Sequence, residues 1–210
     1  EYLPLAFNGY AENVYLVLHD LDPSINVIHL DPKLKQIFCL SEWHVSYFTE
    51  KIPSCKHLTT HFYYGIDFNN FQNVNQISKI PCQFIYSSFP NRGLLPLLQM
   101  WPEIYKMNPQ ATLHIYSDVN GKWVNQVEPQ HMTEIKRLLD LYQPMNICYH
   151  GWVDKKTLAN AWLSSDIWLY PCIFKETFCL TALEAALTNT LVITNDLAAL
   201  QNTVSERGVI

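Results

Sequence analysis

The sequence predicts an α/β protein built around parallel β-sheets. Short apolar runs rich in β-branched and aromatic residues alternate with longer runs whose apolar residues recur at the helical period. Strands that alternate with helices in this way form βαβ units, in which the strands run parallel. Hydrophobic residues make up 49% of the 210 residues and charged residues 16%, a balance that supplies a core and excludes a disordered chain.

The first third of the chain predicts three extended segments and one short helix. Residues 14–18 (V-Y-L-V-L), 35–40 and 57–64 predict the extended segments. Ser41 predicts the N-cap of a helix that reaches Phe48, because a serine hydroxyl can accept a hydrogen bond from a free amide of the first turn. We interpret residues 1–72 as part of one domain. A polar stretch over 69–81 follows, and we assign its residues 73–81 to a linker.

Residues 82–210 predict a second domain, a Rossmann-like parallel sheet. Expected strands cover residues 83–87, 111–116, 146–149, 167–170 and 191–194, and expected helices cover 92–107, 128–142, 155–164 and 178–187. Ligands of such sheets bind beyond the carboxyl ends of the strands. The sequence therefore predicts a site in the loops that begin after Ser87, Tyr116, His150, Pro171 and Asn195.

Two carboxylates with seven residues between them give the strongest sign of a binding site. Glu176 follows a strand, and Glu184 interrupts an otherwise apolar helix, where an unpaired carboxylate is costly to bury. Amides at a helix start bind anions, and the ~9 Å rise from Phe178 to Glu184 suits a ligand with a central diphosphate and hydroxyls at both ends. The spacing equally allows a purely structural interpretation, in which Glu176 caps the helix and Glu184 is solvated.

A second candidate loop reads S-S-F-P-N-R-G from Ser87 to Gly93. Arg92 stands there at the start of a helix, and its planar guanidinium group suits phosphate oxygens. Gly93 would let the backbone approach a ligand closely. Taken alone, this loop also fits an ordinary exposed arginine.

These motifs together resemble the donor-binding domain of retaining glycosyltransferases of family 4, also called group 1. The similarity spans residues 84–204 and includes S-S-F-P-N-R-G-L-L-P-L-L, C-Y-H-G-W-V and the E-x7-E element in W-L-Y-P-C-I-F-K-E-T-F-C-L-T-A-L-E-A-A. Upstream, V-Y-L-V-L-H-D and Y-Y-G-I-D-F-N-N-F look like the closing part of the acceptor-side domain of that family. The resemblance implies the GT-B fold, in which a nucleotide sugar binds between two Rossmann-like domains.

The resemblance also implies residue roles. Glu176 would contact the donor sugar, Glu184 the ribose hydroxyls and Arg92 the diphosphate, while the loop at residues 151–153 would contact the base. His19, which follows a strand, resembles a histidine near the donor sugar. The catalytic residues expected in this way are His19 and Glu176. The expected donor site comprises Ser87, Arg92, Gly93, Trp152, Val153, Glu176, Thr177, Phe178, Cys179, Leu180 and Glu184.

The implied activity is transfer of a sugar, with retention of configuration, from a UDP- or GDP-sugar to a glycan, lipid or protein acceptor. The resemblance implies that neither a metal nor a further cofactor is needed, because enzymes of this family usually work without a metal. A sugar phosphorylase or epimerase would use the same architecture. A catalytically silent nucleotide-sugar-binding module of a larger protein is the alternative from another class.

Several positions depart from the family pattern. Arg92 lacks the neighbouring lysine of many relatives, and Lys175 is the candidate for the second positive charge. Asn189 stands where the family has glycine, and it can adopt the same left-handed conformation. Ala198, Gln201 and Asn202 stand where relatives tend to have Gly, Pro and Glu. The resemblance therefore implies no ligand contact for this stretch.

Composition excludes other classes of partner. The net charge of −5 and the lack of a basic run argue against nucleic acid. No run approaches ~18 apolar residues, so no membrane span is expected. The six cysteines, several of them inside apolar runs, favour a reducing compartment and hence the cytoplasm. His57 and His61 would lie ~13 Å apart in a strand, too far to share a metal ion. The chain starts without Met, and we expect it to be part of a longer polypeptide.

Overall fold

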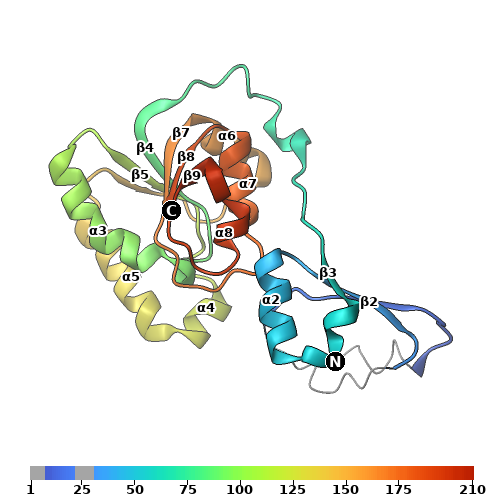
Figure 1. Cartoon of the computed structure of the whole chain (residues 1–210). Helices are drawn as coiled ribbons and strands as arrows, with labels where there is room; N and C mark the ends of the chain where they lie inside the picture. Colours follow the sequence, from blue (N-terminus) through green and yellow to red (C-terminus); the bar gives the residue numbers. More distant parts are fainter. Residues whose placement is uncertain (1–7, 22–30) are drawn as a thin grey trace.

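A computed structural model describes residues 8–21 and 31–210. The described residues form two parallel sheets, one of three strands in the order β1-β2-β3 and one of six strands in the order β6-β5-β4-β7-β8-β9 (Figure 1). We call the parts built on these sheets the N-terminal unit and the C-terminal unit. The expected α/β class with parallel sheets is confirmed.

The N-terminal unit contains β1 (Val14–Val17), β2 (Leu34–Cys39), β3 (Thr59–His61) and α2 (Glu42–Lys51). Ser41 is the N-cap of α2 as expected, and its Oγ accepts a hydrogen bond from the amide of His44 at 3.1 Å. The expected extended segment 57–64 is wrong at its start, because residues 53–58 form the 3₁₀ helix η1 (Pro53–Leu58). Proline fixes φ at a helical value, which favours this short helix over a strand.

The C-terminal unit follows the expected alternation closely. Its strands are β4 (Ile80–Tyr86), β5 (Thr112–Ile115), β6 (Ile147–Tyr149), β7 (Ser165–Tyr170), β8 (Leu191–Thr194) and β9 (Gly208–Val209). Its helices are α3 (Leu94–Met107), α4 (Lys122–Val127), α5 (Pro129–Tyr142), α6 (Lys155–Ser164), α7 (Leu180–Leu187) and α8 (Leu200–Thr203), with the 3₁₀ helices η2 (Phe68–Phe71), η3 (Pro90–Arg92) and η4 (Ser205–Arg207). Every expected strand and helix of this unit is present, with ends that differ by a few residues, and α4 and α8 are additional helices.

The strand order of the larger sheet creates a switch point. From β4 the chain moves outward to β5 and β6, then returns to the other side of β4 to form β7. Helices α3, α4 and α5 lie on one face of the sheet, and α6, α7 and α8 lie on the other (Figure 1). The loops after β4 and β7 therefore diverge at the carboxyl edge of the sheet, where open α/β sheets bind ligands.

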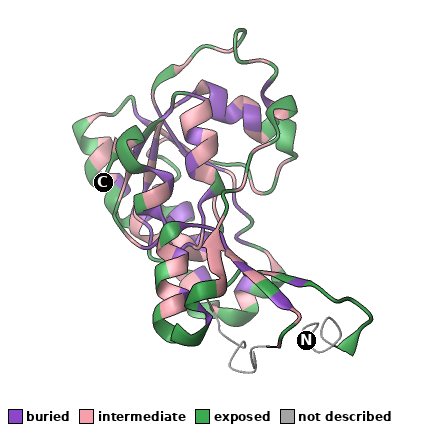
Figure 2. Cartoon of the chain, turned by 45° about the vertical axis from the view of Figure 1, so that its right-hand side comes forward, coloured by how far each residue is buried: buried purple, intermediate pink, exposed green. Residues whose placement is uncertain are grey.

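Large aromatic side chains fill the core of the C-terminal unit, which Figure 2 shows as the buried layer between the helices. Trp101, Trp162 and Trp168 are fully buried, as their periodic positions predict. The indole nitrogen of Trp101 donates to the carbonyl of Met145 at 2.8 Å. Each such ring removes a large apolar area from water, so these residues fix the distance between the sheet and its helices.

Residues 65–79, which we call the crossover segment, connect the two units and pack on the C-terminal one. Phe71 is buried in the core of that unit, and the side-chain amide of Asn73 donates to Asn160 of α6 at 2.9 Å. Lys79 donates to the carbonyl of Trp162 and to the hydroxyl of Thr190. The residues expected to be a linker, 73–81, are thus held by side-chain contacts, and β4 already starts among them at Ile80.

The two units meet at the start of α7. The hydroxyl of Ser41 donates to the carbonyl of Thr177 at 2.8 Å, and the hydroxyl of Thr177 donates to the carbonyl of His19 at 2.9 Å. Asn202, one of the positions that depart from the family pattern, accepts from the amide of Trp43 at the start of α2. The ring of Phe178 packs against the rings of Tyr63 and Tyr64, with 5.9 and 5.8 Å between the ring centroids.

The sequence predicts no membrane span and unpaired cysteines, and the structure can be compared with both expectations. Across residues 8–21 and 31–210, no helix is both long and apolar enough to cross a bilayer. All six cysteines are unpaired, and Cys39, Cys55, Cys172 and Cys179 are buried. Burial raises the pKa of the Cys39 thiol to about 12, so this thiol stays protonated.

Asn189 allows a test of the left-handed backbone conformation that follows α7. Its φ of 54° is left-handed, and its side chain is exposed. An alanine there carries the Cβ penalty without the local hydrogen bonding of asparagine, so we expect Asn189→Ala to lower the free energy of unfolding by about 1 kcal/mol. Asn189→Gly should be neutral or stabilising. Urea unfolding of both variants measures this, and equal stability of the two would contradict it.

Candidate active site

A cavity of about 260 Å³ opens at the switch point of the larger sheet. The loops after β4, β5 and β7 and the start of α7 form its walls. Seven residues of the expected donor site line it, namely Ser87, Arg92, Trp152, Glu176, Phe178, Cys179 and Leu180. The cavity thus lies where the strand pattern and the two loop motifs predicted a site.

A second cavity, of about 380 Å³, continues the first along α7. The two share residues of their walls, including Ser87, Tyr116, Trp152 and Leu180. Glu184 and Val153 of the expected site line the second cavity, together with Asp67 and Asn70 of the crossover segment. A single cleft therefore runs from Glu176 to Glu184, and we call it the α7 cleft.

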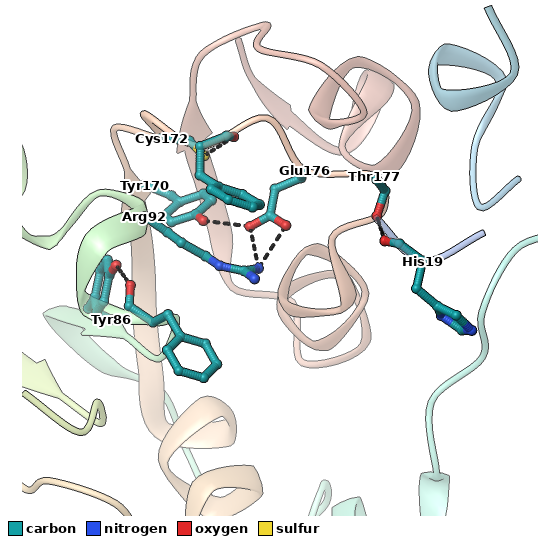
Figure 3. A network of polar contacts seen from close by, with 9 residues as sticks. His19, Tyr86, Arg92, Tyr170, Cys172, Glu176 and Thr177 are labelled. Carbon is teal, nitrogen blue, oxygen red and sulfur yellow. Dashed lines mark hydrogen bonds and ion pairs between the residues drawn. The ribbon is translucent and has the colours of Figure 1, made fainter. Parts of the chain in front are cut away.

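Glu176 and Arg92 meet as an ion pair at one end of the α7 cleft (Figure 3). Nη1 of Arg92 lies 3.0 Å from Oε1 and 2.8 Å from Oε2 of Glu176, and the hydroxyl of Tyr170 donates to Oε1 at 2.9 Å. Glu176 is only 4% exposed. Burial raises the pKa of its carboxyl group, while the charge of Arg92 and the hydrogen bond from Tyr170 oppose that shift.

The guanidinium group of Arg92 reaches from the ion pair to the open cleft. Its side chain keeps 32% of its surface exposed. Its Cζ atom lies 4.4 Å from the ring centroid of Phe174 and 5.5 Å from that of Phe89, and such positions near aromatic rings favour a cation. A guanidinium group has five N–H donors, and Nη1 supplies those that Glu176 accepts. Within residues 8–21 and 31–210 the remaining donors form no further hydrogen bond, so they can meet an anion in the cleft.

The start of α7 adds backbone amides to the same wall. Cys179 is the N-cap residue, and no side chain of the described residues caps this end of the helix. The first amides of a helix have no acceptor inside it and carry the positive end of the helix dipole. Phe178, Cys179, Leu180 and Thr181 all line the first cavity, so these amides stand beside the space next to Arg92.

Glu184 lies further along α7 and is half-buried. Burial raises the pKa of its carboxyl group to about 7, against the influence of the Trp162 indole and the Lys155 ammonium group. Near neutral pH this carboxyl group is therefore divided between its two protonation states. Among the described residues, the buried hydroxyl oxygen of Ser87 on the opposite wall has no hydrogen-bond partner. The cleft thus holds an acceptor at Glu184 and an unused hydroxyl at Ser87.

Gly93 was expected to let the backbone approach a ligand, but it lies against the backbone of Pro171. A Cβ atom on it would lie 2.9 Å from the carbonyl oxygen of Pro171, and its φ of 157° is outside the range of most residues. Gly93 does not line the α7 cleft and instead lets η3 approach the end of β7. It supports the site by bringing Arg92 close to Glu176.

The remaining expected residues lie at the junction of the units. Thr177 turns toward the N-terminal unit and bonds to His19 and Ser41. The ring of His19 points away from Glu176 (Figure 3), and its Nδ1 lies 2.6 Å from the hydroxyl of Tyr64. His19 lines neither cavity, and Lys175 is exposed outside both.

The structure adds site residues that sequence reasoning missed. Tyr170 ends a strand and was assigned to the strand alone, although its hydroxyl reaches Glu176. Asp67 and Asn70 were assigned to the end of the acceptor-side domain and its polar tail, and the packing of Phe71 brings them to the cleft. Tyr116 was marked only as a strand end, and its ring stacks on His150 at 4.4 Å. His150 stacks in turn on His114, so it is part of a ring stack at the sheet edge.

The fold and the cleft at its switch point are those of a two-unit Rossmann-type protein. Residues 83–210, more than half of the chain, match the family described as glycosyl transferases group 1. The chain therefore belongs to the group 1 glycosyltransferase family. The sequence resemblance to this family is thereby confirmed.

Solved structures share the fold over nearly the whole chain. A glycosyltransferase from Rickettsia africae covers 93% of this chain with a TM-score of 0.67 and 16% identity. Anabaena HepE, solved in complex with UDP and glucose, covers 94% with a TM-score of 0.69 and 15% identity. At this identity the likeness shows the fold, which is GT-B as expected.

The chain spans 53% and 57% of the length of these two solved chains. Among curated proteins, an uncharacterized 41.2 kDa protein in the cps region of Klebsiella pneumoniae is 39% identical over 61 residues. That match covers 29% of this chain and 17% of the Klebsiella protein. The chain therefore corresponds to part of the length of its relatives.

The pKa of Glu184 leads to a prediction about stability. An unfolded glutamate loses its proton near pH 4.5 and the folded one near pH 7, so the free energy of unfolding falls as pH rises through this interval. Glu184→Gln removes the ionisation, and we expect it to be more stable than the wild type by on the order of 1–3 kcal/mol at pH 8. Urea unfolding at pH 5 and pH 8 measures the difference. An equal difference at both values would contradict the assignment.

Proposed function

We propose that the chain binds a nucleotide-diphosphate sugar in the α7 cleft and forms the donor side of a retaining glycosyltransferase. The observation that carries this proposal is that Arg92, Glu176, the start of α7 and Glu184 all line one continuous cleft. Family membership supports the same class of reaction. UDP is the first nucleotide to test, because HepE, a protein of the same fold, was solved with UDP and glucose.

The order of groups along the cleft fits the parts of such a donor. The free N–H groups of Arg92 and the first amides of α7 would meet the diphosphate. Glu176 would accept a hydrogen bond from a sugar hydroxyl, and Glu184 would accept the ribose hydroxyls. The base would then lie beside Trp152 and Val153, opposite the crossover segment.

The reaction follows from this placement. The bond between the anomeric carbon and the diphosphate oxygen breaks, a bond from the anomeric carbon to the acceptor oxygen forms, and the acceptor proton passes to the departing diphosphate. The role of the protein is to position the donor and to stabilise the charge that develops on the diphosphate. With the donor in this position, Arg92 and the α7 amides would lie beside the developing charge.

Calorimetry tests the proposal with UDP, UDP-glucose, GDP and GDP-mannose as probes. We expect one pair to bind in the micromolar range or tighter, with the sugar form favoured over the bare nucleotide. Binding of none of the four would overturn the proposal. Transfer assays of the full-length polypeptide with the preferred donor then separate a transferase from a silent binding module, because a module binds without turnover.

Glu184 provides the sharpest test of the nucleotide end. We expect Glu184→Ala to weaken UDP-glucose binding about ten- to a hundredfold, because charge-assisted bonds to the ribose are lost. The melting temperature of the free variant should be unchanged or higher, since a costly buried carboxylate is removed. A lower melting temperature with unchanged affinity would instead assign Glu184 a structural role.

Metal ions should not be required for donor binding. The diphosphate charge is met by Arg92 and the helix amides, and in the described part of the chain no group of three His, Cys, Asp or Glu side chains could hold a metal ion. UDP-glucose affinity should therefore change less than about twofold on addition of EDTA, well under the 1.4 kcal/mol of a tenfold effect. Loss of binding in EDTA, restored by Mg²⁺ or Mn²⁺, would show that the diphosphate site is misassigned.

A further inference from the structure

The hydrogen bonds to Glu176 leave its two oxygens in different states. Oε1 accepts from Arg92 at 3.0 Å and from Tyr170 at 2.9 Å, while Oε2 accepts only from Arg92, at 2.8 Å, among the described residues. Each carboxylate oxygen has about two acceptor sites. Oε1 is therefore fully used by the protein, and Oε2 keeps one site for a ligand.

Tyr170 is held rigidly in the position from which it bonds to Glu176. Its side chain is fully buried at the end of β7. Its ring stacks on that of Trp168 with 4.8 Å between the ring centroids, and it lies tilted against the ring of Tyr86 with 6.1 Å between the centroids. Burial raises the pKa of its hydroxyl group far above the usual range, so the group remains a hydrogen-bond donor. Figure 3 shows this hydroxyl directed at the Glu176 carboxylate beside the guanidinium group of Arg92.

Packing alone does not explain a tyrosine at this position. A phenylalanine would make the same ring contacts, and burying a hydroxyl group is unfavourable unless it forms a hydrogen bond. The hydroxyl donates to Glu176 at 2.9 Å, and it also interacts with the buried thiol of Cys172, a weaker partner than a carboxylate. The hydroxyl group is therefore explained by what it does to the carboxylate.

We propose that Tyr170 is a positioning residue for donor-sugar recognition: its hydroxyl holds Oε1 of Glu176 and thereby presents Oε2 to a hydroxyl of the sugar. This inference rests on the proposed function, in which Glu176 contacts the donor sugar. Without the Tyr170 hydroxyl, the carboxylate can rotate about its last bond while Arg92 still neutralises it. The sugar contact would weaken, and the nucleotide contacts along α7 would remain.

The test compares UDP and UDP-glucose binding by calorimetry in the wild type and in Tyr170→Phe, with GDP and GDP-mannose as the second pair. UDP-glucose affinity should fall about three- to tenfold in the variant, the effect of one lost hydrogen bond, while UDP affinity stays within about twofold. Trp101→Phe is the matched control. It also removes a buried hydrogen bond from the same core, to Met145 rather than to the site, and should preserve both affinities.

A double-mutant cycle separates positioning from a general structural effect. In a Glu176→Ala background, Tyr170→Phe should no longer change the ratio of UDP-glucose to UDP affinity, because the group it positions is absent. If Tyr170→Phe yields too little folded protein, Glu176→Asp tests the same alignment, since it withdraws the carboxylate from Tyr170 by one methylene. It should show the same loss for UDP-glucose and spare UDP.

The outcomes distinguish this inference from the proposed function. A wild type that binds UDP-glucose more tightly than UDP, with the same preference in Tyr170→Phe, overturns the inference alone. A fall in both affinities in Tyr170→Phe, or a loss that persists in the Glu176→Ala background, also overturns it. A wild type that binds neither nucleotide pair overturns the proposed function and the inference together.

Discussion

The buried carboxylate of Glu176 is the constraint on which the site depends. An ionised group with 4% exposure is stable only if its charge is paired and its oxygens are hydrogen-bonded. The partners are far apart in the sequence but come from neighbouring strands of the sheet: Arg92 follows β4, and Tyr170 ends β7. The amide of Ile173 also donates to the carbonyl of Arg92, and Gly93 permits the close approach. The segments after β4 and β7 are therefore bonded to each other behind the cleft.

The chain around Glu176 joins this rigid corner to the N-terminal unit. Glu176 faces Arg92, while the next residue, Thr177, uses its carbonyl and its hydroxyl to bond to Ser41 and His19. Ser41 caps α2 with the same oxygen that donates to Thr177. The start of α2 and the start of α7 thus share one hydrogen-bonded junction. The loop that carries Glu176 therefore belongs both to the wall of the cleft and to the junction of the two units.

The sequence allowed the parallel sheet, most elements of the C-terminal unit and the two cleft carboxylates to be predicted, because each depends on local periodicity or on a short motif. Three features depended on contacts between distant segments. The hydroxyl of Tyr170 acquires its role only when β7 lies beside η3, and Gly93 is explained by Pro171 rather than by a ligand. The crossover segment looks like a polar linker until Phe71 is placed in the core. A polar composition shows that a segment tolerates water, and it does not show which few residues anchor it.

The charges of the two cleft carboxylates are compensated differently, because their surroundings differ. Glu176 has a cation and a hydroxyl within 3.0 Å, so its charge is compensated before any ligand arrives. Glu184 interacts with the Trp162 indole and the Lys155 ammonium group, but burial outweighs both and brings its pKa to about 7. Because Glu176 already neutralises Arg92, the attraction for an anion comes from the free N–H groups of Arg92 and the α7 amides rather than from net charge. Under the proposed function, α7 would hold the nucleotide from its first amides to Glu184. Arg92 would contribute to the diphosphate site, and Glu176 would recognise the sugar.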